Sequence, residues 1–186
     1  MRDIYAPGVT GCLMTFPRKK IRLPAASYIG LRRYFLTLCC FERHKYFLQE
    51  DFNQHFVGKL REQAAVHQFC VPAYCLMPDH MHLLVEALAV KSNLAPFVKA
   101  FKQVTGFEFE RRTGKQLWQR YYYDHVLRPK DDPNGVAWYI WLNPVRAGLC
   151  EEPRDYRFVG SLTSLWPAGK RPEEIWSPPK KESGST

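Results

Sequence analysis

The amino-acid sequence predicts an α+β protein: a ferredoxin-like βαββαβ sandwich with one antiparallel sheet, followed by a further C-terminal helix. Segments rich in aromatic and β-branched residues alternate with segments whose apolar residues recur every three or four positions, and these are the patterns of strands and helices. Their order is strand, helix, strand, strand, helix, strand, which is the order of ferredoxin-like folds. We expect such an antiparallel sheet to leave one face open.

The first half of the chain supplies one helix and three strands. Residues 32–39 predict the first strand because they are aromatic and apolar. Residues 47–69 predict an amphipathic helix, whose apolar positions at helical spacing are Phe52, Phe56, Leu60, Ala64 and Val66. Residues 73–86 predict two further strands, joined by a turn at 77–79.

The second half supplies the remaining elements. Residues 93–112 predict a helix with a buried stripe formed by Leu94, Phe97, Val98, Phe101, Val104 and Phe107. Residues 118–127 are aromatic and predict the fourth strand. A third helix then begins at Asp132, a good N-cap, with Pro133 at the first helical position. It should end near Asn143, because Pro144 disfavours helical backbone there.

Length and composition indicate one domain, because 186 residues are enough for one core with extensions. We expect a basic N-terminal arm over 1–29, the domain over 30–165 and a disordered tail over 166–186, part of which Trp166 or Trp176 could tether. The six cysteines form no Cys-x-x-Cys pair, which favours a reduced, cytoplasmic setting. With no apolar run near 18 residues, we expect no membrane span.

The charge balance points to nucleic acid. The formal net charge is +9 and aromatic residues make up 15% of the chain, so cations are available for phosphates and rings for unpaired bases. The candidate phosphate contacts are Arg18, Lys19, Lys20, Arg22, Lys102 and Arg146. Each has an alternative: the first four could form a solvated arm, Lys102 could meet only water, and Arg146 could satisfy backbone carbonyls after the helix stop.

His80 and His82 are the candidate metal ligands. Side chains two positions apart share one face of a strand, roughly 7 Å apart along it, so both imidazoles can converge on one ion. Met81, Leu83 and Val85 would then face the core on the other side. Two histidines at this spacing also occur by chance as structural residues, so the pair by itself leaves both interpretations open.

Two longer motifs give a resemblance to a known family. Residues 74–84, which read YCLMPDHMHLL, together with residues 139–149, which read YIWLNPVRAGL, resemble the IS200-like transposases. These are single-tyrosine HUH enzymes, and the closer resemblance is to the REP-associated tyrosine transposase branch. Residues 33–37, 101–103 and 118–124 also resemble family stretches. The resemblance covers roughly residues 17–161.

The resemblance implies an endonuclease that cuts single-stranded DNA near a folded hairpin and forms a 5'-phosphotyrosine bond. His80 and His82 match the paired histidine ligands, and Tyr139 matches the nucleophile on the helix after the core fold. Asn143 falls where some relatives have a glutamine that completes the metal site, and its amide oxygen could be a third ligand. Trp141 stands where this branch more often has histidine.

The resemblance also implies a divalent metal, Mg²⁺ or Mn²⁺. Two imidazoles and an oxygen ligand suit Mn²⁺ better, whereas availability favours Mg²⁺. The expected partner is single-stranded DNA with hairpin structure, bound by a monomer or homodimer associated with the bacterial nucleoid. Because a phenol ordinarily ionises near pH 10, an ion on the scissile phosphate would make attack by Tyr139 feasible.

Two other functions stay open on sequence grounds. One is a catalytically silent module that binds nucleic acid on an open sheet face, as RNA-recognition domains do. The other is a metal-dependent phosphoesterase whose nucleophile is water.

Three other tyrosines, Tyr121, Tyr122 and Tyr123, are alternatives to Tyr139 as the nucleophile, and we expect stacking or core roles for them.

Overall fold

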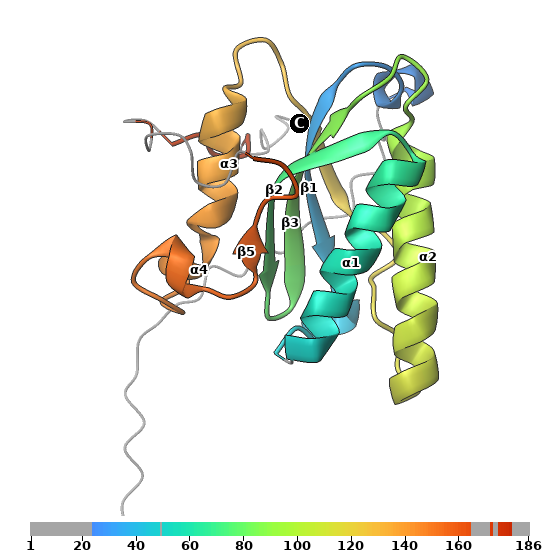
Figure 1. Cartoon of the computed structure of the whole chain (residues 1–186), viewed down its shortest axis with the longest axis vertical. Coiled ribbons are helices and arrows are strands. Elements are labelled where there is room, and N and C mark those ends of the chain that lie inside the picture. The colour runs from blue at the N-terminus through green and yellow to red at the C-terminus, as the bar shows by residue number, and fades with distance from the viewer. Residues whose placement is uncertain (1–23, 49, 165–171, 173–174, 180–186) are drawn as a thin grey trace, which may run out of the picture.

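The computed structural model of the chain describes residues 24–48, 50–164, 172 and 175–179. One sheet stands between helices on both of its faces (Figure 1). The main elements are β1 (Arg33–Cys39), α1 (Glu50–Val66), β2 (Phe69–Met77), β3 (His80–Ala87), α2 (Leu94–Thr113), β4 (Tyr123–Val126), α3 (Pro133–Trp141), α4 (Asn143–Arg146) and β5 (Val159–Gly160). Short 3-10 helices span Ala25–Tyr28 (η1), Phe41–Arg43 (η2) and Pro153–Asp155 (η3).

The sheet has the predicted topology. Its strand order is β4-β1-β3-β2-β5, and every neighbouring pair is antiparallel. The first four strands, with α1 and α2 as crossovers, form the βαββαβ unit, which confirms the predicted ferredoxin-like fold. The short strand β5 adds to the free edge of β2.

Element boundaries differ from the prediction in four places, of which one is the start of β2, at Phe69 instead of residue 73. The first helix is shorter, at Glu50–Val66, and Val66 is exposed rather than buried. The fourth strand covers only Tyr123–Val126, because the residues before it run as irregular backbone. The last predicted helix ends at Trp141, and Pro144 lies in the first turn of a separate short helix, α4, where proline is tolerated.

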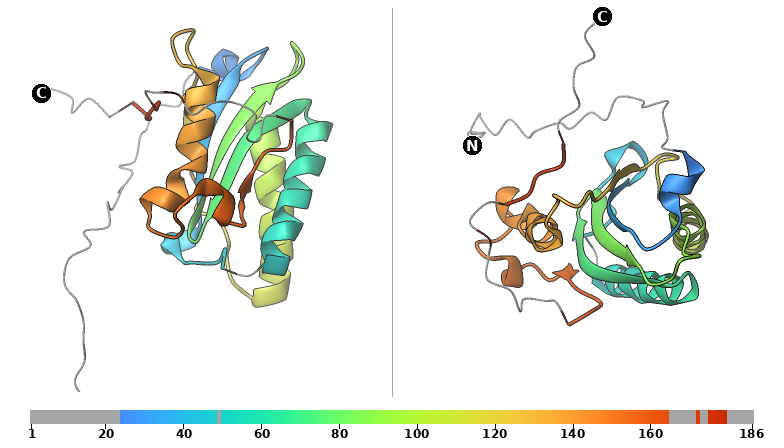
Figure 2. Two further views of the ribbon diagram at one scale, coloured as in Figure 1. Left: turned by 60° about the vertical axis from the view of Figure 1, so that its left-hand side comes forward. Right: turned by 90° about the horizontal axis from the view of Figure 1, so that it is seen from above.

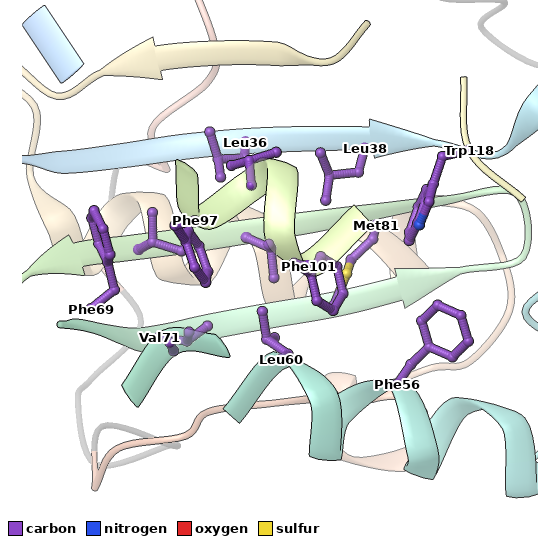
Figure 3. Close-up of a cluster of buried hydrophobic side chains, with 14 of the residues drawn as sticks. Leu36, Leu38, Phe56, Leu60, Phe69, Val71, Met81, Phe97, Phe101 and Trp118 are labelled. Atoms are coloured by element: carbon purple, nitrogen blue, oxygen red, sulfur yellow. The ribbon is translucent and has the colours of Figure 1, made fainter. Parts of the chain in front are cut away.

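The main core fills the space between the sheet and the helices α1 and α2. Figure 3 shows Leu36 and Leu38 of β1 facing Phe97 and Phe101 of α2. Met81, Leu83 and Val85 also point into this core, as the alternation along the histidine strand predicted. The predicted stripe was wrong at two positions: Phe107 is 67% exposed and Val104 is only half-buried, and Thr105 and Phe109 complete the buried stripe instead.

The opposite face of the sheet is not open, which corrects our expectation. Helix α3 lies across it, and the view from above in Figure 2 shows α3 on one side of the sheet with α1 and α2 on the other. A second apolar cluster joins the two layers and includes Phe35, Cys75, Leu84, Val136 and Ile140. Because α3 begins and ends on this face, it brings its side chains next to those of β1 and β3.

The segments that flank the domain also make contacts. Tyr28 in η1 is 6% exposed, and its hydroxyl donates to Asp124, so this part of the expected arm packs on the domain. Within the part of the chain that the structure describes, no helix combines the length and the apolar character that crossing a membrane requires.

Candidate active site

Two histidines lie side by side on the sheet face that α3 covers. His80 is the first residue of β3 and His82 follows two positions later, so both side chains leave the strand on the same side. Their Nε2 atoms are 3.0 Å apart, and the two rings meet edge to face. The pair therefore converges on one point in the way that the strand spacing predicted.

Each imidazole is fixed through its other nitrogen. The Nδ1 of His82 lies 3.0 Å from the hydroxyl of Thr37, its cross-strand neighbour on β1. The Nδ1 of His80 lies 2.6 Å from one carboxylate oxygen of Asp79, whose other oxygen forms an ion pair of 2.8 Å with the Nε of Arg43. Contacts of this kind orient histidine ligands in metal sites, and here they turn both Nε2 atoms toward each other.

The charge states of this cluster suit metal binding. Burial lowers the pKa of His82 well below its ordinary value, and the proximity of His80, Arg146 and Arg43 lowers it further. Burial opposes ionisation of Asp79, but its hydrogen bond with His80 and the charge of Arg43 outweigh burial and lower its pKa. His82 is consequently neutral near pH 7, which is the form that binds a metal ion.

Tyr139 is carried to the histidines by α3. Asp132 caps this helix by accepting hydrogen bonds from the backbone N–H groups of Asn134 and Gly135, at 3.1 and 2.9 Å, as its position predicted. The centre of the Tyr139 ring is 6.2 Å from that of His82. Phe35 lies against both, 5.4 Å from His82 and 5.6 Å from Tyr139 between ring centres.

Asn143 and Arg146, two further residues of the motif at 139–149, contact the C-terminal end of α3. The amide nitrogen of Asn143 donates to the carbonyls of Tyr139 and Ile140, at 2.8 and 3.3 Å. Arg146 donates to the carbonyl of Tyr139 and places its guanidinium carbon 4.2 Å from the centre of the Tyr139 ring. The last carbonyls of a helix lack the regular partners of its interior, so both side chains stabilise the helix end that carries Tyr139.

The remaining candidate DNA contacts lie elsewhere. Lys102 projects from α2, on the other side of the sheet, and its ammonium group donates to the backbone carbonyls of Gln119 and Arg120 at 2.7 and 3.1 Å. Arg18, Lys19, Lys20 and Arg22 fall outside the described residues.

Trp176 covers the outer side of Tyr139. Its ring centre is 5.5 Å from that of Tyr139 and 5.2 Å from that of Phe35. Its indole N–H donates to Asp131 at 3.3 Å, and the other carboxylate oxygen of Asp131 lies 2.9 Å from the Nε2 of His125. The tail is therefore tethered at this residue, directly over the candidate nucleophile.

The donor set is suited to a divalent ion. Two nitrogens at right angles, each about 2.1 Å from one ion, are about 3 Å apart, which is the separation of the two Nε2 atoms. Within the described ranges, no cluster of three His, Cys, Asp or Glu side chains could hold a metal. The pair therefore fits as two ligands of an ion whose further ligands come from other groups, such as an amide oxygen, water or phosphate.

Sequence reasoning missed the residues that orient the site. Asp79 directly precedes His80, so a carboxylate next to a candidate ligand was an available signal. Thr37 and Phe35 come beside His82 only through the register of β1 against β3, in which Thr37 pairs with His82. Arg43 reaches Asp79 from η2, where its backbone has a positive φ of 60°.

The ferredoxin-like fold, with paired histidines on the sheet and a tyrosine on the helix that covers them, is typical of single-tyrosine transposases. Comparisons with known proteins support this class. A model of the family described as "Transposase IS200 like" matches residues 30–134. The chain belongs to the IS200-like transposase family.

Relatives come from the REP-associated branch. The chain is 27% identical over 136 residues to a Haemophilus influenzae protein provisionally named a REP-associated tyrosine transposase, a match that covers 67% of this chain and 77% of the relative. It is 23% identical over 134 residues to the REP-associated tyrosine transposase of Escherichia coli, covering 70% and 77%. A solved REP-associated tyrosine transposase, bound to a REP hairpin, shares the fold with a TM-score of 0.63 and 21% identity over 76% of this chain and 82% of that one.

Proposed function

We propose that this transposase cleaves and rejoins single-stranded DNA beside a hairpin through a covalent bond between Tyr139 and a 5' phosphate. His80 and His82 hold a divalent ion, Mg²⁺ or Mn²⁺, and the amide oxygen of Asn143 is a candidate third ligand. The observation that carries the proposal is the common placement of the two Nε2 atoms and the Tyr139 ring on one face of the sheet.

The residues divide the work of the reaction. Tyr139 gives up its phenolic proton, its oxygen bonds to phosphorus, and the bond from phosphorus to the 3' oxygen breaks, so that the departing oxygen takes up a proton as a 3'-hydroxyl. The guanidinium of Arg146, which lies over the ring, stabilises negative charge that develops on the phenol oxygen and the phosphate. Attack by a 3'-hydroxyl on the phosphotyrosine reverses these steps and rejoins strands.

A divalent ion at the histidine pair would withdraw charge from the scissile phosphate and orient it for in-line attack. The protein prepares for this role by holding both imidazoles in place through Thr37 and Asp79 and by keeping His82 neutral.

Two observations support hairpin DNA as the partner. The E. coli and H. influenzae relatives carry names that refer to REP sequences, and the solved relative is described as bound to a REP hairpin. The formal net charge of +9 supplies the general attraction to phosphate that any such binding requires.

Incubation with Mn²⁺ and a labelled single-stranded oligonucleotide, carrying a hairpin from the host's repeat sequence, tests the proposal. We expect a protein–DNA adduct that survives denaturation and a released fragment whose 3'-hydroxyl a polymerase can extend. Tyr139→Phe should abolish the adduct. Tyr123→Phe is the matched control, because Tyr123 is also packed against Phe35, at 6.1 Å between ring centres, but lies on β4.

Each alternative function has its own outcome in this experiment. Cleavage by Tyr139→Phe at the wild-type rate would show that water is the nucleophile. Tight binding without cleavage under any divalent ion would show a silent binding module. The covered sheet face speaks against that module, because α3 occupies the surface on which bases would stack.

A further inference from the structure

A groove runs along α2 on the side of the sheet away from Tyr139. It has a volume of about 850 Å³ and lies between α2 and the irregular segment 116–122 that leads into β4. No step proposed above uses it. Phe107, the one residue of the predicted buried stripe that is exposed, lines this groove.

The groove combines cations with aromatic surface. Lys99 and Arg120 line it, both are exposed, and neither forms an ion pair within the described part of the chain. Phe107 offers an exposed ring in the wall, and Tyr121, next to the groove, is 60% exposed. The guanidinium carbon of Arg120 lies 5.4 Å from the centre of the Tyr121 ring. Proteins that bind single-stranded nucleic acid use this combination in general, because cations contact phosphates and aromatic rings stack on bases.

The wall of the groove is linked to β1 and β4, two strands that also carry residues of the candidate active site. The backbone N–H of Gln119 donates to the carbonyl of Cys39 at 2.9 Å, so the groove wall joins the end of β1. Arg43, which holds Asp79, also donates to the sulfur of Cys39 at 3.0 Å. Three residues beyond Arg120, Tyr123 is on the site face, where it pairs with Thr37.

Lys102 holds the segment 116–122, which forms one wall of the groove, in place. Its two hydrogen bonds to the carbonyls of Gln119 and Arg120 tie the segment to α2, and its ammonium group lies 5.9 Å from the centre of the Tyr122 ring. The segment is therefore held against α2, and it presents the exposed Arg120 and Tyr121 beside the groove.

We propose that this groove binds the single-stranded DNA that flanks the hairpin, with phosphates on Lys99 and Arg120 and bases stacked on Phe107 and Tyr121. The proposal deepens the proposed function, because it assigns the route of the strand outside the active site. Its basis is the excess of cations over the one carboxylate of the lining, Glu110, together with the two exposed rings.

Binding measurements on Tyr139→Phe protein test the groove without cleavage, so that a failure of the chemistry and a failure of the groove are distinguishable. The probes are a bare hairpin and the same hairpin with long single-stranded flanks, each fluorescently labelled. We expect the flanks to increase affinity. Phe107→Ala should remove about five-fold or more of that gain, since stacking of one base has about that value. Arg120→Gln should reduce the gain and make the dependence of affinity on salt less steep.

Arg154→Gln is the matched control, because Arg154 is exposed on η3, away from the groove. It should bind both probes as the parent protein does. Equal affinity of Phe107→Ala and the parent for the flanked hairpin would overturn the proposal. The proposal would also be overturned if Phe107→Ala lost as much affinity for the bare hairpin as for the flanked one. A change in the sedimentation of Phe107→Ala would show instead that the groove is a contact between two copies of the chain.

Discussion

The Nε2 atoms of His80 and His82 lie 3.0 Å apart while each ring is held at Nδ1 by a different residue, Asp79 for the first and Thr37 for the second. The two ligand candidates are thus oriented before any ion arrives. An oriented pair loses little conformational freedom on binding, which is the general benefit of preorganisation.

Thr37→Val should weaken metal binding. The variant keeps the shape of the side chain but removes the hydroxyl that orients His82. Loss of such an orienting contact costs about 10- to 100-fold in metal affinity, measurable by Mn²⁺ titration. Thr37→Ser should restore it. Thr105→Val is the control, since Thr105 is equally buried but bonds Trp118 in the other core; a similar loss of Mn²⁺ affinity in both variants would refute the orienting role.

Phe35→Leu should reduce the rate of adduct formation by more than its loss of folding stability can explain. Phe35 packs against both His82 and Tyr139, so a smaller, differently shaped side chain lets both rings shift. We expect the free energy of unfolding to fall by about 1 kcal/mol and the adduct rate by about ten-fold or more. Phe56→Leu, on α1 in the core on the other side of the sheet, should lose similar stability in urea unfolding but keep its adduct rate. Equal rates in the two variants would contradict the alignment role of Phe35.

Trp176→Ala should speed the reaction. Tyr139 is only 8% exposed, and the Trp176 ring lies against it, so a DNA phosphate must displace this part of the tail. Removing the indole should raise the initial rate of adduct formation several-fold, whereas Trp176→Phe should have a smaller effect. A slower reaction of Trp176→Ala would show that the indole assists DNA binding instead of covering the site.

Asp131→Asn should lower stability at neutral pH but not in acid. Burial opposes ionisation of Asp131, but hydrogen bonds from the backbone N–H of Arg128 and from His125 and Trp176 outweigh it and lower its pKa. A lowered folded-state pKa stabilises the fold above the ordinary carboxyl value, about 3.9, and this contribution is lost as the pH falls through the folded value.

Urea unfolding between pH 7 and pH 3 measures this effect. Wild type should exceed Asp131→Asn by about 1 kcal/mol at pH 7, and the difference should shrink below about pH 4. Glu62→Gln, an exposed carboxylate on α1, controls for general charge effects. A constant difference across the whole range would mean that ionisation of Asp131 does not stabilise the fold.

Local sequence patterns were enough to predict the framework of the site. Alternation along β3 placed His80 and His82 on one face and Met81 in the core, because this period follows from strand geometry alone. Asp132 and Pro133 located the start of α3 through capping preferences that act within one turn. Tyr139 was assigned from the resemblance, and the structure then brought it next to His82.

The contacts that sequence reasoning missed depend on long-range packing. Thr37 meets His82 across 45 positions, through a register that no local pattern specifies. Helical periodicity assigned Phe107 to the core, but the stripe turns toward Thr105 and Phe109, and Trp118 bonds Thr105 there. The open sheet face was expected from the βαββαβ unit alone, and α3 covers it because the chain continues beyond that unit.

Peptide mapping of the covalent adduct tests the central claim most directly. After reaction with a hairpin oligonucleotide and Mn²⁺, digestion by nuclease and protease should leave a nucleotide on the peptide that contains Tyr139, joined through a 5' phosphate. The three tyrosines at 121–123 serve as internal comparison, because they lie in a different peptide. A nucleotide on Tyr121, Tyr122 or Tyr123, or a linkage to a 3' phosphate, would contradict the assignment of Tyr139 as the nucleophile.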